Sequence, residues 1–185
     1  MPEAAQVGLF IHFIGVFALG GATAISLVVL TMIQRAKTVQ EIRHWGGLGA
    51  LLSKYYVFPV LGLILLLSGG YLVDKIDEDW GEGWIGVSAV ALIAAVAVGF
   101  FVNTPRFKEI GMGANQAPDG PVPPTLTAKI NDPVLVGAVY GLTMTALGIV
   151  WNMTTQPGNA GALLAIVIFA GAGAAAGVLT AQQRT

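Results

Sequence analysis

Five long stretches without Asp, Glu, Lys or Arg constrain the fold of this chain more than any other feature. They cover residues 7–32, 57–73, 85–102, 134–153 and 161–180, and each holds 17 to 26 residues. A helix needs about 17 to 25 residues to cross roughly 30 Å of hydrocarbon. Because backbone amides in lipid must bond internally, such stretches form spanning helices. The sequence therefore predicts a single domain, residues 1–185, with an all-α fold: a polytopic membrane helical bundle of five transmembrane helices.

The charged residues are few and nearly balanced. They make up 10% of the chain, against about 25% in a soluble domain, and the formal net charge is -1. No positive excess remains to hold a phosphate backbone, so we expect no nucleic-acid binding. The chain has no Cys, which excludes disulfides, thiolate metal sites and thiol catalysis.

The basic residues predict the orientation, because Lys and Arg near span ends stay on the cytoplasmic side. With the N-terminus outside, only Lys75 lies on the outer side, where the loop 74–82 carries five acidic residues. We therefore predict an N-out, C-in topology. The inner segments then hold the other eight basic residues: Arg35, Lys37, Arg43, Lys54, Arg106, Lys108, Lys129 and Arg184.

Two inner loops, 33–56 and 103–133, separate the predicted spans. The first carries Ile42, Trp45 and Leu48 at three-residue steps, which predicts an amphipathic segment on the inner membrane surface, either a connector or a docking surface. The second contains six Pro and three Gly, a composition typical of an extended loop. We expect it to be disordered or held by a partner.

Small residues form ridges on the last two spans. Gly137 and Gly141 lie one turn apart in the fourth span, as Gly173 and Gly177 do in the fifth. Such ridges let helix backbones approach closely in lipid. They predict packing within the bundle, or contact with other membrane subunits or a second copy; a lipid, quinone or pigment in the groove is a further alternative.

His12 is the one His, Asp, Glu, Lys or Arg within the five stretches, about 7 to 8 Å below the outer end of the first. An ionisable group at that depth is a candidate site. Gly8 and Gly15 lie on the same helical face and predict room beside the imidazole for something flat or bulky. His12 either hydrogen-bonds a neighbouring helix or ligates a metal or a haem.

Other potential ligands are few. Met153 ends the fourth span on the same side as His12, so the two side chains form a candidate copper site. His44 lies beyond about 30 Å of helix, which excludes two histidines of one chain on one iron. The acidic loop 74–82 is either a cation site or negative charge kept on the outer side, and it lacks the calcium-loop pattern.

Catalytic signatures are absent from the sequence. It contains no HExxH, no P-loop and no serine nucleophile motif, and no acidic or basic pathway runs through its spans. We therefore expect a protein that is not an autonomous enzyme.

Three short motifs carry a family resemblance over the first half of the chain, to about Trp84. They are His12 and Gly15 in the first span, the basic stretch with Arg35, Arg43 and Trp45, and the Ser68-Gly69-Gly70 end of the second span. This pattern resembles the predicted integral membrane proteins related to CopD and HemJ. The resemblance implies a compact helical bundle that holds a haem-like ligand, haem b by similarity, at His12.

The HemJ branch is associated with protoporphyrinogen oxidation and also relies on a lysine within its bundle, whereas no Lys lies in a span here. The CopD branch is linked to copper uptake through His and Met residues. We therefore expect a small subunit or accessory factor in a bacterial inner membrane, with a haem or other tetrapyrrole near His12. The alternatives are a HemJ-like haem-dependent oxidoreductase and a CopD-like copper permease.

Overall fold

The computed structural model describes residues 3–54, 57–76 and 78–184, and of residues 50–54 and 57–58 only the backbone. Within this part of the chain every extended regular element is a helix, so the predicted all-α fold is confirmed. The elements are α1 (Glu3–Arg35), α2 (Val39–Lys54), α3 (Val57–Lys75), α4 (Gly83–Val98), the π-helix η1 (Gly99–Asn103), α5 (Thr104–Gln116), α6 (Pro124–Ile130), α7 (Pro133–Thr155) and α8 (Asn159–Gln182).

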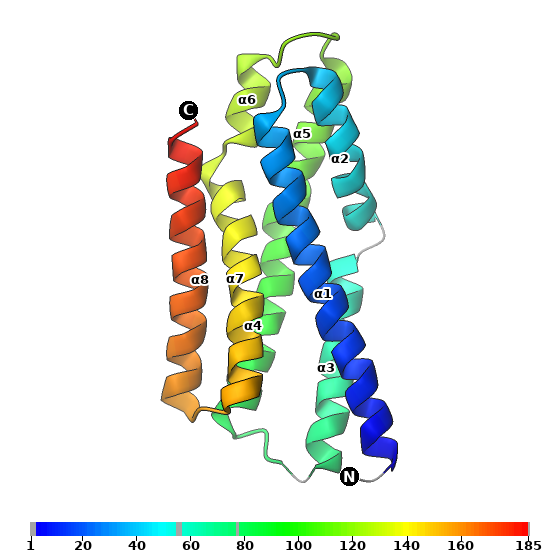
Figure 1. Cartoon of the computed structure of the whole chain (residues 1–185), viewed down its shortest axis with the longest axis vertical. Helices are drawn as coiled ribbons and strands as arrows, with labels where there is room; N and C mark the ends of the chain where they lie inside the picture. The colour runs from blue at the N-terminus through cyan, green and yellow to red at the C-terminus, as the bar shows by residue number, and fades with distance from the viewer. Residues whose placement is uncertain (1–2, 55–56, 77, 185) are drawn as a thin grey trace.

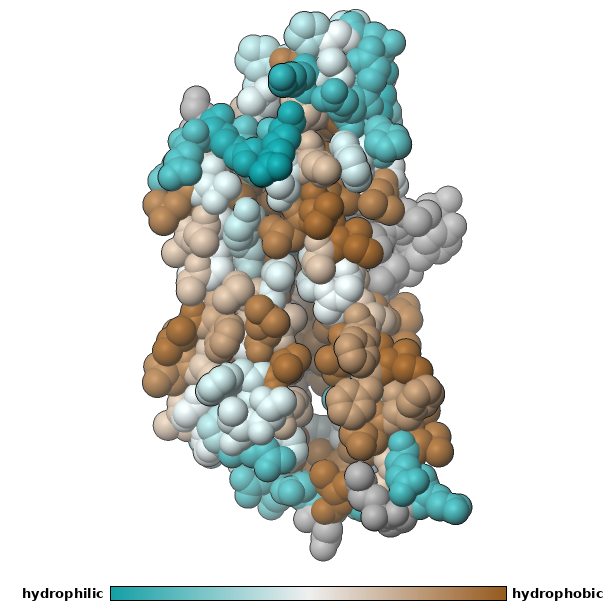
Figure 2. Space-filling model, in the orientation of Figure 1, coloured by the Kyte–Doolittle hydropathy of each residue, from teal (hydrophilic) through white to brown (hydrophobic). Residues whose placement is uncertain are grey.

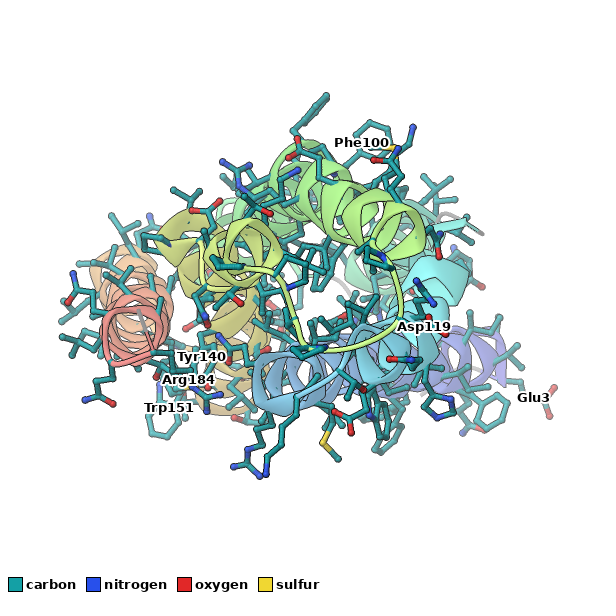
Figure 3. The ribbon with its side chains drawn as sticks, turned by 90° about the horizontal axis from the view of Figure 1, so that it is seen from above. Glu3, Phe100, Asp119, Tyr140, Trp151 and Arg184 are labelled. Carbon is teal, nitrogen blue, oxygen red and sulfur yellow. The ribbon has the colours of Figure 1, made fainter. Side chains whose placement is uncertain are left out.

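The helices run along one long axis (Figure 1). Helix α1 extends over nearly the whole length, and α2 and α3 follow one another back down beside it. Helix α4 continues through η1 into α5 at the upper end, α7 returns downward, and α8 rises beside α7. Seen from above, α8 stands at the edge of the bundle, and Phe100 and Trp151 point outward (Figure 3).

Four helical segments are long and apolar enough to cross a membrane, which indicates a membrane protein. They are Glu3–Arg35, Gly83–Gln116, Pro124–Thr155 and Asn159–Gln182. The predicted stretch 57–73 also lies within a helix, the 19-residue α3. Helix α1 alone, at 33 residues, is about 50 Å long and exceeds the hydrocarbon thickness by about 20 Å.

The upper end of the bundle is a headpiece of α2, α5, α6 and the last turns of α1. The prediction for 33–56 was wrong in its placement, because α2 runs along α1 and packs on α5 (Figure 1). Val39 and Ile42 of α2 are almost fully buried. Of the predicted apolar series, Ile42 and Trp45 therefore face protein in the headpiece, whereas Leu48 is exposed.

The prediction of an extended loop over 103–133 was also wrong. Residues Thr104–Gln116 and Pro124–Ile130 are helical, and the prolines explain why. Pro105, Pro124 and Pro133 stand in the first turns of α5, α6 and α7, where a missing N–H costs nothing. The turn 117–123 between α5 and α6 and residues 131–132 between α6 and α7 lack helix, and Val39 N donates to Gly120 O at 3.0 Å.

One large apolar core fills the upper end. It joins α1, α2, α5, α6 and α7, and also reaches the last turn of α8. Its members are Val29, Leu30, Ile33, Val39, Ile42, Ile110, Ala114, Leu126, Ile130, Leu135, Val136, Val139 and Ala181. On α1 this core begins at Val29, and no earlier residue of α1 belongs to it.

Among the described residues, the lower half has no comparable core. Its helices form two groups, the α1–α3 pair and the α4–α7–α8 group, and Figure 2 shows a narrow opening between them. They approach each other where Val96 of α4 meets α3, at Gly62, whose added Cβ would lie 2.6 Å from Val96 Cγ2. Large apolar side chains such as Phe17, 79% exposed, cover the outside.

The glycine ridges of the last two spans pack α7 against α8. A Cβ at Gly177 would lie 2.6 Å from Val136 O, and one at Gly173 would lie 2.7 Å from Tyr140 O. An added Cβ at Gly137 would contact Val178 of α8, and one at Gly141 would contact Ala174 of α8. The four glycines are thus covered within one chain, so the expected contact with another subunit or a second copy would need a different surface.

Candidate functional site

His12 lies in the seam between α1 and α3. One face of α1 carries His12 among small residues, because these positions are spaced by three, four or seven residues along the helix. They are Ala5, Gly8, His12, Gly15 and Ala22. The four small residues are buried, and α1 packs on α3 there. The imidazole is therefore a polar group in a close-packed seam of small residues, and it is half-buried.

A hydrogen bond ties the imidazole to α3. His12 Nδ1 lies 3.0 Å from Ser68 Oγ, and Ser68 Oγ donates to Ile64 O at 2.7 Å. The ring also lies beside Gly69, where an added Cβ would be in ordinary van der Waals contact, 3.4 Å from His12 Cε1. Of the two interpretations of His12, the hydrogen bond to a neighbouring helix is the one observed. It leaves the other ring nitrogen, Nε2, for further chemistry.

The room that Gly8 and Gly15 were expected to leave beside His12 is filled by α3. A Cβ on Gly8 would lie 2.7 Å from Tyr71 Cδ1, and one on Gly15 would lie 2.9 Å from Leu65 Cδ2. These glycines therefore allow close helix packing and do not form a pocket. A macrocycle has no place inside the seam and would have to lie on the open side of the ring.

Met153 and His12 stand on different helix groups. Met153 is half-buried on α7, which packs against α4 and α8, whereas His12 faces α3. Over the residues that the structure describes, no three His, Asp or Glu side chains gather closely enough to hold a metal ion. The arrangement does not bring the two predicted copper ligands together through any described contact.

The acidic loop 74–82 uses some of its carboxylates internally. Asp74 pairs with Lys75 at 2.7 Å, and this contact raises the pKa of Lys75. Asp79 Oδ1 accepts from the backbone N–H of Gly81 at 2.8 Å. The geometry thus fits an internal ion pair and turn formation better than a cation site.

His44 is exposed on α2 in the headpiece, where its ring meets Trp45 edge-on at a centroid distance of 5.4 Å. It therefore belongs to the opposite end of the bundle from the lower part of α1 (Figure 1).

A second buried polar contact, missed by the sequence reasoning, joins the α4–α7–α8 group. Asn152 is fully buried, and its Nδ2 donates to Ser88 Oγ at 3.3 Å and to Ala162 O at 3.2 Å. Its Oδ1 has no partner. The only signal in the sequence was an Asn and a Ser within apolar spans, residues that a search for ionisable groups passes over.

The junction of headpiece and bundle carries two further contacts absent from the sequence predictions. Arg106 Nε donates to Asp132 Oδ2 at 2.8 Å, while Asp132 Oδ1 accepts from Val134 N and caps α7. Gln34 Nε2 donates to Asn131 Oδ1 at 3.2 Å. These contacts anchor α1, α5 and α7 to the short α6–α7 turn.

Comparison with known proteins gives no relationship. No family model, no curated protein and no solved structure matches this chain.

Proposed function

We propose that this protein is a small integral subunit or accessory factor of a bacterial inner-membrane complex, with five spans and its headpiece in the cytoplasm. The charge distribution supports this orientation. Eight of the nine basic residues fall on the headpiece side of the spans, and the acidic loop 74–82 falls on the other. Helix α3 supplies the fifth span, since 19 helical residues rise about 28 Å.

The observation that carries the proposal is the open lower half. Two helix groups separated by an opening, in a region whose outer surface is apolar, leave a space that lipid, a ligand or a partner helix must fill (Figure 2). The spans hold no acidic or basic side chain besides His12, so no group there is suited to proton or ion transfer. A role in holding a ligand or partner fits this composition better than transport or catalysis.

A haem or another tetrapyrrole is the ligand that one further observation favours. A metal-ligating histidine commonly donates its other ring N–H to a neighbouring acceptor, and the His12–Ser68 contact has this form. His12 Nε2 would hold the iron, on the half-open side of the ring. When bound, the haem would supply a redox-active or ligand-binding iron; the chain's own part is to hold and orient the imidazole.

The proposal is tested by purifying the protein in mild detergent and recording its absorption spectrum. We expect a Soret band that His12→Ala abolishes and His44→Ala leaves intact. In native membranes we expect the protein to be part of a complex that is larger than the purified chain. A colourless monomer in native membranes would contradict the proposal, and stoichiometric copper in it would favour the permease alternative. Loss of the band in His44→Ala would contradict the single-histidine site.

A further inference from the structure

We propose that Ser68 is a positioning residue that fixes the tautomer of His12, with the proton on Nδ1 and the free lone pair on Nε2. The role as a ligand to haem iron rests on the proposed function. The tautomer itself follows from the contacts around the ring and does not depend on any ligand.

The first step is the position of the single hydroxyl proton of Ser68. Ser68 Oγ lies 2.7 Å from Ile64 O, the carbonyl one turn earlier in α3, and a carbonyl can only accept. The hydroxyl proton is therefore directed to Ile64. Toward His12 Nδ1, at 3.0 Å, the oxygen has only lone pairs to offer, so Nδ1 must donate.

The second step is the Leu65 carbonyl. Ser68 Oγ also lies 3.3 Å from Leu65 O, so two carbonyls, those of Ile64 and Leu65, are available to accept its single proton. A neutral imidazole has one N–H, and with Ser68 Oγ acting as the acceptor at Nδ1 the proton belongs there. Nε2 is then unprotonated.

The consequence concerns metal binding. A histidine binds a metal through a nitrogen with a free lone pair, and the partner of its other nitrogen sets the tautomer and the ring orientation. In this seam, the contact with Ser68 holds the ring through Nδ1. Nε2 is then left as an electron-pair donor, suited to haem iron.

Nuclear magnetic resonance of the ring nitrogens tests the tautomer directly. The chain has two histidines, so the His44→Gln variant with ¹⁵N-labelled histidine reports on His12 alone. In lipid nanodiscs we expect a spectrum of the Nδ1–H tautomer. Ser68→Ala should shift the population toward Nε2–H. Ser68→Thr, which keeps a hydroxyl, and Ser88→Ala, which removes a buried hydroxyl from the other helix group, should keep the parent spectrum. An Nε2–H tautomer in the parent, or no change in Ser68→Ala, would overturn the inference.

Titration with ferric haem b separates this inference from the proposed function. We expect Ser68→Ala to weaken haem binding about 10- to 100-fold, as loss of the partner of a ligating histidine does, and His12→Ala to abolish it. Equal affinities for the parent and Ser68→Ala would overturn the positioning role. If the parent binds no haem, the proposed haem site fails, while the nitrogen spectra still decide the role of Ser68.

Discussion

The headpiece and the lower half of this bundle hold their helices together by different means. In the headpiece, branched side chains such as Leu30 and Ile110 interdigitate in one core that reaches six helices. In the lower half, small residues bring helices together in pairs, and single polar contacts such as His12–Ser68 join them. Large apolar side chains gain most where burial removes them from water, whereas close backbone packing of small residues is the means by which helices associate in lipid.

The two halves also differ in how many elements each contact joins. Arg43 of α2 donates to Ala114 O, Ala117 O and Asp119, so one side chain closes the end of α5 and the turn after it. Below, the α1–α3 pair and the α4–α7–α8 group each have their own polar contact. The headpiece therefore holds the α1–α3 pair and the α4–α7–α8 group together.

The largest expected effect compares two apolar residues of α1. Leu30 is fully buried in the headpiece core, and Phe17 is 79% exposed on the lipid-facing side. Leu30→Ala should lower the free energy of unfolding by about 2–5 kcal/mol, because it leaves a cavity. Phe17→Ala should change it by less than about 1 kcal/mol, since that side chain packs on lipid. Steric trapping in bicelles measures both, and equal losses would contradict the division into two halves.

Arg43→Ala should have the next largest effect. The guanidinium bonds two carbonyls of the α5 end at 2.8 and 2.6 Å, and hydrogen bonds to a charged group contribute about 1.5–3 kcal/mol. The partly exposed pair with Asp119 adds little. Hydrogen exchange should speed up in α2 and α5 and stay unchanged in α8. Arg35→Ala, an exposed arginine at the end of α1, is the control; protection lost equally in α8 would argue against a separate headpiece.

Gly177→Ala tests the close packing of α8 on α7, beside Val136 of the upper core. The new Cβ would lie 2.8 Å from Gly137 Cα and push α8 from α7, which we expect to cost about 1–3 kcal/mol. Gly171→Ala on the same helix is the matched control, because no atom lies within 4 Å of its Cβ position. It should be neutral or stabilise by up to about 1 kcal/mol through helix propensity. Thermal melting in one detergent compares them, and a harmless Gly177→Ala would refute the packing role.

The smallest effect is expected at the polar contact of the α4–α7–α8 group. A double-mutant cycle of Asn152→Ala and Ser88→Ala should give a coupling energy of about 0.6–1.7 kcal/mol, the range for hydrogen bonds between membrane helices. Thr154→Ala, an exposed hydroxyl that bonds only its own helix, provides the control. A coupling energy much above that range would mean that the lower half is held together as strongly as a core, and would contradict the difference between the two halves.

The sequence predicted the long apolar helices well, because absence of charge is a property of each stretch alone. The predicted stretches 7–32, 134–153 and 161–180 lie inside α1, α7 and α8. The loop 103–133 was misjudged because proline has opposite effects by position: within a helix it breaks the hydrogen bonding, and at the first turn it fits. Composition does not distinguish those positions.

The candidate site was predicted only in part. His12 stands out as a lone ionisable residue in a span, and its partner Ser68 was noticed only for its place in a motif. Whether Gly8 and Gly15 leave a pocket or admit a helix depends on what α3 places opposite them, and here Tyr71 and Leu65 fill the space. A small residue has the same sequence signature in both cases.

The central claim, that the headpiece and the acidic loop lie on opposite sides of a membrane, is tested most directly by labelling introduced cysteines. The chain has no Cys of its own, so single variants carry no background. We expect a membrane-impermeant maleimide to label Glu78→Cys in intact cells and to label Gln116→Cys only after the membrane is opened. Labelling of both variants in intact cells would contradict the claim.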